Sequence, residues 1–78
     1  DLDALGLLCP LPVLKARKRM QMLQAGQVLR VLADDPAARI DMPHFCGEAG
    51  HELLAVQDAP DGRYYFIRKG AWPRAYSP

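Results

Sequence analysis

The chain has 78 residues, half of them hydrophobic, and its ten basic and nine acidic residues give a net charge of +1. These values predict one small domain with a single core, and they give no indication of a nucleic-acid or membrane partner. No apolar run approaches the ~20 residues that a membrane span needs. The opening with Asp1 and Asp3 does not resemble a signal peptide, so we expect a cytoplasmic protein.

A short strand is predicted over Leu2 to Leu8, and Gly6 allows the backbone to bend before Cys9. Pro10 and Pro12 then predict a helix start, because the first N–H groups of a helix have no intrahelical partner and a proline there loses no bond. Cys9 would lie next to the N-cap, where the positive end of the helix dipole favours a thiolate. The alternative is an inert small residue that fills the strand–helix junction.

The first helix is predicted from Pro10 to Gln24, with Gly26 as its stop. Its apolar residues recur at intervals of three, four and three, which predicts one buried stripe. The stripe consists of Val13, Ala16, Met20 and Leu23.

The opposite face of this helix combines cations with apolar side chains. Lys15, Lys18 and Arg19 lie on it, and helical spacing projects Leu11 and Met22 to the same side. One interpretation is a solvated basic face with incidental exposed apolar residues, which are common. The other is a docking surface for an acidic partner that must reach the thiol.

The apolar run from Val28 to Ala33 predicts a second strand, and a helical crossover between the two strands makes them parallel. The segment after it is helical in character, but Pro43 should interrupt the helix. Asp41 could cap the restart, so a regular second helix is predicted mainly over Met42 to Gly50.

Two further strands are predicted over Glu52 to Asp58 and over Arg63 to Lys69. The turn residues Pro60-Asp61-Gly62 between them indicate an antiparallel hairpin. The order βαβαββ predicts an α/β two-layer sandwich, in which a four-stranded mixed sheet has both helices packed on one face. The domain is expected to span residues 1–70, followed by an irregular C-terminal tail over residues 71–78.

Few other residues suggest chemistry. Cys46 falls in the second helix and is interpreted as a core residue, a resolving thiol being the alternative. His44 and Cys46 are two positions apart and do not share a helix face, and His51 would make only a third ligand, so no metal site is predicted. Ser77 is the only serine and threonine is absent, which leaves Cys9 as the candidate nucleophile.

Several stretches of the sequence carry a resemblance to a known family, and the C-P-x-P motif at a strand–helix junction is the most specific of them. The stretches are Leu2-Asp3-Ala4-Leu5-Gly6, Cys9-Pro10-Leu11-Pro12-Val13, Ala33-Asp34-Asp35-Pro36-Ala37, Asp41-Met42-Pro43, Phe45-Cys46, His51-Glu52-Leu53-Leu54 and Ile67-Arg68-Lys69-Gly70. Together they resemble the TusA (SirA-like) sulfur-carrier family over nearly the whole chain.

The resemblance implies a sulfurtransferase that carries sulfur as a persulfide on Cys9, with Pro10 and Pro12 as supporting residues and without a cofactor or metal. A cysteine desulfurase would load the sulfur, and a sulfur-relay protein would take it towards 2-thiouridine at the tRNA wobble position. Other branches of the family serve sulfur oxidation or molybdenum-cofactor supply. Two features depart from the family pattern and bear on partner choice. One is Leu11, where many members of the tRNA branch carry an acidic residue, and the other is a tail with Trp72. We expect a monomer without membrane association or stable direct binding of nucleic acid.

Two other classes of protein remain open. A thiol-independent regulatory or RNA-binding module gains some support from Tyr64, Tyr65 and Phe66, which lie beside cations in the last strand. A dithiol redox protein would use Cys9 and Cys46.

Overall fold

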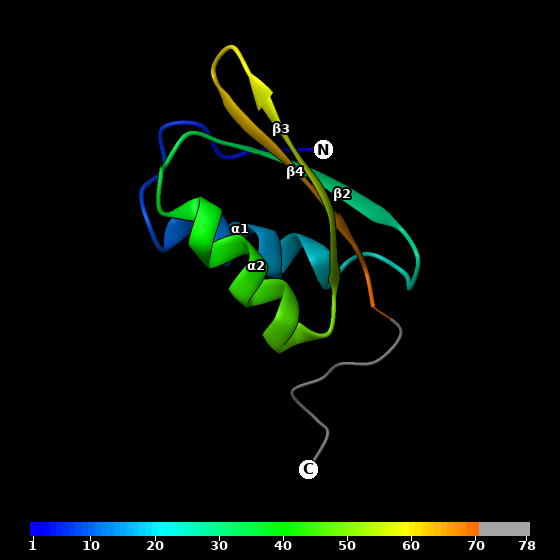
Figure 1. Cartoon of the computed structure of the whole chain (residues 1–78). Coiled ribbons are helices and arrows are strands. Elements are labelled where there is room, and N and C mark those ends of the chain that lie inside the picture. Colours follow the sequence, from blue (N-terminus) through cyan, green and yellow to red (C-terminus); the bar gives the residue numbers. More distant parts are fainter. Residues whose placement is uncertain (71–78) are drawn as a thin grey trace.

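The computed structural model describes residues 1–70, and the predicted tail with Trp72 lies outside this range. The elements in chain order are β1 (Leu2–Asp3), α1 (Leu11–Met20), β2 (Val28–Ala33), α2 (Ala38–Ala49), β3 (Glu52–Ala59) and β4 (Gly62–Arg68). One four-stranded mixed sheet has the strand order β1-β2-β4-β3, and both helices lie on the same side of it (Figure 1). The predicted fold class is confirmed.

The sheet pairs strands that are far apart in the sequence. β1 is parallel to β2, with Leu2 opposite Val31, as the helical crossover requires. β4 runs antiparallel to β2, with Val28 opposite Arg68 at one end and Ala33 opposite Arg63 at the other. β3 forms the edge beyond β4 and is joined to it by the predicted hairpin. β4, the last strand of residues 1–70, is therefore a central strand of the sheet.

Alternate strand residues face the helices and form the core. Leu29, Val31 and Ala33 of β2 are buried, as are Tyr65 and Ile67 of β4, in keeping with the two-residue period of a strand. The helical side of the core consists of Ala16, Met20, Ala38, Met42, Phe45 and Cys46, with Val13 and Leu23 packed against it while partly buried. The buried stripe predicted for the first helix is confirmed.

The first strand is shorter than predicted, because β1 ends at Asp3 and not at Leu8. The Asp3 carboxylate accepts a hydrogen bond from the Leu5 N–H at 2.9 Å, and this aspartate turn bends the chain away from β2. Gly6 follows with a positive φ of 78°, which glycine adopts without steric cost. Residues 4–10 consequently form a loop that leads into α1.

The first helix also ends early, at Met20 and not at Gln24. The Met20 carbonyl oxygen accepts the Leu23 N–H at 3.1 Å in a tightened last turn, and the Lys69 ammonium donates to the same oxygen at 2.6 Å. The chain then turns, and Gly26 adopts a positive φ of 90° before β2.

The second helix begins earlier than predicted and contains the proline that was expected to interrupt it. α2 starts at Ala38 and includes Pro43, so the predicted restart at Met42 is wrong. Pro43 cannot donate to the Arg39 carbonyl, and an interior proline costs a helix ~3 kcal/mol. Burial of Met42 and Phe45 in the core stabilises the helix by about 1.5–3 kcal/mol for each side chain, which outweighs the lost bond.

Candidate functional site

Cys9 lies in the loop directly before α1, and its thiol is exposed. Pro10 is the N-cap of α1, and Pro12 lies buried in the first turn. The peptide bond between Cys9 and Pro10 is cis. The predicted helix start at the two prolines is confirmed, with Leu11 as the first helical residue, so the thiol stands at the positive end of α1.

Two aspartates from the connection between β2 and α2 hold the loop that carries the thiol. Asp35 Oδ2 accepts a hydrogen bond from the Cys9 N–H, and the Asp34 carboxylate accepts one from the Gly6 N–H at 3.1 and 3.2 Å. Asp35 Oδ1 also accepts the Ala37 N–H at 3.1 Å. One carboxylate thus ties the Cys9 loop to the start of α2, a role that was not predicted from the sequence.

Asp41 contacts the thiol itself. Cys9 Sγ donates a hydrogen bond to Asp41 Oδ2 at 2.9 Å, so the residue expected to cap a helix restart faces the candidate nucleophile. This hydrogen bond raises the pKa of Cys9, and desolvation and the negative charges of Asp41 and Asp35 raise it further. The pKa of Cys9 is therefore shifted upward, because two nearby carboxylates oppose the negative charge that the helix dipole favours.

A shallow groove of about 170 Å³ opens between α1 and α2 beside the thiol. The Arg17 guanidinium lies over the Phe45 ring at 5.1 Å, which links the two helices. Binding sites for small molecules generally enclose ~300–1,000 Å³, so this groove is too small to retain a free substrate and leaves the thiol open to a partner. Its polar walls are formed by Arg17, Asp41, His44 and Glu48, of which only Asp41 and His44 were considered from the sequence.

Cys46 lies in the core on α2, where its side chain is 3 % exposed, and burial raises the pKa of this thiol to about 11. The predicted core position is confirmed. His51 Nδ1 accepts the Gly70 N–H at 3.0 Å, and His44 Nε2 lies 3.4 Å from a Glu48 carboxylate oxygen. Within residues 1–70, no three His, Cys, Asp or Glu side chains are gathered as metal ligands.

The cations predicted for a docking surface do not share one environment. Lys15 and Lys18 are exposed, whereas Arg19 is half-buried and its guanidinium donates to the Asp1 carbonyl oxygen at 2.9 Å. The two lysines are therefore the cations of this face that are available to a partner.

Exposed apolar side chains lie near these lysines. Leu11 is 46 % exposed, and Leu8 and Leu14, which were not predicted, are 69 % and 50 % exposed. Leu14 follows Leu11 by three positions and so shares its helix face. Met22 is also exposed but lies beyond the end of α1. Docking at this face remains a prediction.

Comparison with known proteins identifies the family of the chain. The family model described as Sulfurtransferase TusA matches residues 1–69. The chain belongs to the TusA family. This confirms the resemblance that the C-P-x-P motif carries.

Relatives within the TusA family match most of the chain. The sulfur carrier protein TusA of Pseudomonas entomophila (strain L48) is 50% identical over 70 residues, which cover 90% of this chain and 88% of the relative. That of Pseudomonas syringae pv. syringae (strain B728a) is 49% identical over 70 residues, with 88% and 82% covered. The crystal structure of a SirA-like protein from Desulfitobacterium hafniense superposes with a TM-score of 0.74 at 31% identity, covering 88% of this chain and 95% of that one. In this TusA family member, no helix of residues 1–70 is long and apolar enough to cross a membrane.

Proposed function

We propose that this chain is a sulfur carrier that accepts sulfur as a persulfide on Cys9. The observation that carries the proposal is an exposed thiol fixed at the start of α1 by Pro10, Pro12 and the Asp35 carboxylate. A carrier needs an accessible thiol on a rigid mount, and it does not need a pocket that retains a substrate. The name of the relatives, sulfur carrier protein, supports the same function.

Each transfer is an exchange between a thiol and a persulfide. The Cys9 sulfur attacks the terminal sulfur of the donor persulfide, a sulfur–sulfur bond forms on Cys9, the donor bond breaks and the donor cysteine leaves as a thiolate. The thiol proton of Cys9 passes to the leaving donor thiolate or to water, and Asp41 Oδ2, which accepts the Cys9 hydrogen bond at 2.9 Å, favours the protonated thiol between transfers. The exchange involves no net oxidation or reduction, so it requires no cofactor.

The proposed donor is a cysteine desulfurase, and the proposed acceptor is a sulfur-relay protein on the route to 2-thiouridine at the tRNA wobble position. The Asp35-Pro36 and Phe45-Cys46 patterns, which resemble the tRNA branch of the family, support this route. Leu11 departs from that branch, so sulfur oxidation and molybdenum-cofactor supply are the alternative destinations. The carrier is proposed to act as a cytoplasmic monomer without stable binding of nucleic acid.

Intact mass under non-reducing conditions tests the function. The protein is incubated with a cysteine desulfurase and cysteine and then measured without reductant. A persulfide adds one sulfur atom, a disulfide between the two cysteines removes two hydrogens, and a thiol-independent binding module changes by neither amount. A mass gain of one sulfur that reductant reverses supports the carrier, and an unchanged mass contradicts it.

Cys46→Ala is predicted to lower stability and to leave sulfur loading intact. The Cys46 side chain packs in the core, so its truncation should lower the free energy of unfolding by roughly 0.5–3 kcal/mol. Urea unfolding measures the stability, and the mass assay measures the loading. Loss of loading in a variant that is still folded would assign Cys46 a resolving role.

Reversing the charges of Lys15, Lys18 and Arg19 to Glu is predicted to slow loading by the donor. An acidic donor surface is attracted to these cations at long range, so the reversal should lower the association rate, and the wild-type rate should fall with salt. Second-order loading rates at low and high salt measure the effect.

A matched pair of single variants controls for net charge. Lys18→Glu changes the α1 face, and Arg39→Glu makes the same charge change on α2; neither side chain forms a salt bridge among residues 1–70. Equal loading rates for the two single variants would show that the α1 face is solvated and does not dock the donor. A triple variant with the wild-type rate and salt dependence would lead to the same conclusion. Thermal melts show whether each variant is folded.

A further inference from the structure

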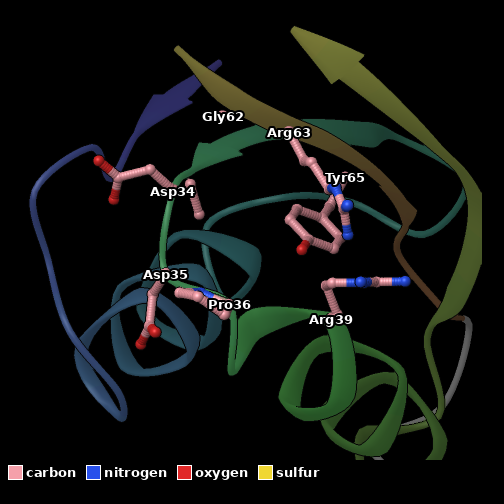
Figure 2. A pocket seen from close by; sticks show the side chains of 8 residues that line it. Asp34, Asp35, Pro36, Arg39, Gly62, Arg63 and Tyr65 are labelled. Atoms are coloured by element: carbon pink, nitrogen blue, oxygen red, sulfur yellow. The ribbon is translucent and has the colours of Figure 1, made fainter.

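A second cavity lies where the end of β2, the start of β4 and the first turn of α2 meet (Figure 2). Its volume is about 340 Å³, against about 170 Å³ for the groove at Cys9, and the two share no lining residue. This volume falls at the lower end of the ~300–1,000 Å³ that small-molecule sites span. No step of the proposed sulfur transfer uses this cavity.

The aspartates at the edge of the cavity are engaged elsewhere. Asp34 and Asp35 accept hydrogen bonds from backbone N–H groups of the Cys9 loop and of the α2 start. Figure 2 shows both carboxylates on the side away from Arg39, Arg63 and Tyr65. The charged groups that remain for a ligand are therefore the arginines.

Arg39 and Arg63 bring positive charge to the cavity from two elements, α2 and β4 (Figure 2). Among the described residues, Arg39 forms no salt bridge. Arg63 uses its Nε in an ion pair with Asp58 Oδ1 at 3.0 Å and also hydrogen-bonds the Tyr65 hydroxyl, and the other N–H groups of its terminal nitrogens remain as donors.

Tyr65 adds a neutral donor. Its side chain is 1 % exposed, and it lines the cavity beside the arginines (Figure 2). Burial raises the pKa of the Tyr65 hydroxyl, although the charges of Arg63 and Arg39 lower it in part. The hydroxyl therefore stays protonated at neutral pH and can donate a hydrogen bond.

We propose that this cavity binds the phosphate group of a small ligand. Each guanidinium presents a planar set of N–H donors that matches a phosphate in a bidentate manner, and the Tyr65 hydroxyl supplies another donor. The N–H groups of residues 37–40 at the start of α2 are bonded within that turn, so the side chains and not a bare helix end form the site. Inorganic phosphate and a small phosphate monoester share this chemistry.

The test is a nuclear magnetic resonance titration of the whole unloaded chain with sodium phosphate at neutral pH. Sodium chloride keeps the ionic strength constant. Saturable shifts are expected for the Asp35 and Gly62 amides and for the Arg39 Nε–H. Arg39→Gln should weaken binding by about fivefold or more, because it removes a charged donor. Arg30→Gln alters an arginine of β2 that does not line the cavity and should keep the affinity within about twofold.

A second titration with ribose 5-phosphate separates the two sources of phosphate. Tighter binding than that of inorganic phosphate assigns the site to monoesters, and equal or weaker binding assigns it to the free ion. Shifts that chloride alone reproduces, shifts that do not saturate, or an equal loss in Arg30→Gln overturn the proposal. Arg39→Gln breaks no ion pair of the described chain, so its spectrum should show an intact fold. Since no sulfur donor is present, the result is independent of sulfur transfer.

Discussion

Cys9→Ser is expected to abolish sulfur loading. Incubated with a cysteine desulfurase and cysteine, the variant should gain no sulfur, a loss of about a hundredfold or more in loading rate, because a serine hydroxyl is a weak nucleophile and forms no persulfide. The fold should be unchanged, since the Cys9 side chain is exposed and a serine hydroxyl can still donate to Asp41. Peptide mapping by mass spectrometry locates any sulfur that is added.

The second cysteine provides the matched control for this experiment. Cys46→Ala keeps the exposed thiol and removes the buried one, so it should load normally while Cys9→Ser does not. Sulfur retained in Cys9→Ser, or mapped to Cys46 in the wild-type chain, would refute the assignment of the carrier cysteine. A circular dichroism melt of each variant separates loss of chemistry from loss of structure.

Asp41→Asn is expected to make the Cys9 thiol more reactive at neutral pH. In the wild-type chain the Asp41 carboxylate accepts the thiol hydrogen bond and raises the pKa of Cys9. An amide of nearly the same shape removes the negative charge, so the pKa of Cys9 should fall and the thiolate fraction at neutral pH should rise. Alkylation by iodoacetamide, which requires the thiolate, should accelerate by about fivefold.

The pH dependence of alkylation measures the direction of the Cys9 pKa shift directly. The midpoint of the wild-type profile should lie above that of an ordinary cysteine, and the midpoint of Asp41→Asn should lie below that of the wild type. Asp35, on the β2–α2 connection, also raises the pKa of Cys9 and is unchanged in both proteins. Arg17, His44 and Glu48 of the same groove likewise remain, so the difference between the profiles isolates Asp41.

Asp41→Glu is the charge-conserving control. It keeps a carboxylate near the thiol, so its alkylation profile should stay closer to the wild type than that of Asp41→Asn. If Asp41→Asn reacts at the wild-type rate across the pH range, the hydrogen bond does not control the thiol. Cys46 does not complicate the measurement, because it is buried in the core.

Local signals in the sequence were sufficient for most of the elements. The strand predicted over Val28 to Ala33 matches β2, and both hairpin strands match within one residue, because an apolar run and a Pro-Asp-Gly turn are local properties. The errors arise where distant contacts decide the outcome. Lys69, which is 49 positions away from Met20 in the sequence, binds the end of α1, and core burial keeps Pro43 inside α2.

In the site, too, the features that depend on neighbouring residues could be predicted, and those that depend on distant contacts could not. Cys9 and its prolines form a short motif whose placement at a helix start can be predicted from residue type. Asp41 is 32 positions away from Cys9, and its contact with the thiol depends on how α2 packs beside α1. The sign of the Cys9 pKa shift could not be predicted from the sequence, because the dipole is local to the motif and the opposing carboxylates are not.

The central place of β4 in the sheet has a consequence for the order in which the newly made chain can fold. A chain growing from its N-terminus contains β2 and β3 before residues 62–68, which pair with both of them, have been synthesised. Until then, β2 can pair only with the two residues of β1, and β3 has no partner among the strands of residues 1–70. Unpaired strand edges favour association with other chains. The nascent chain is therefore exposed to aggregation until β4 is complete.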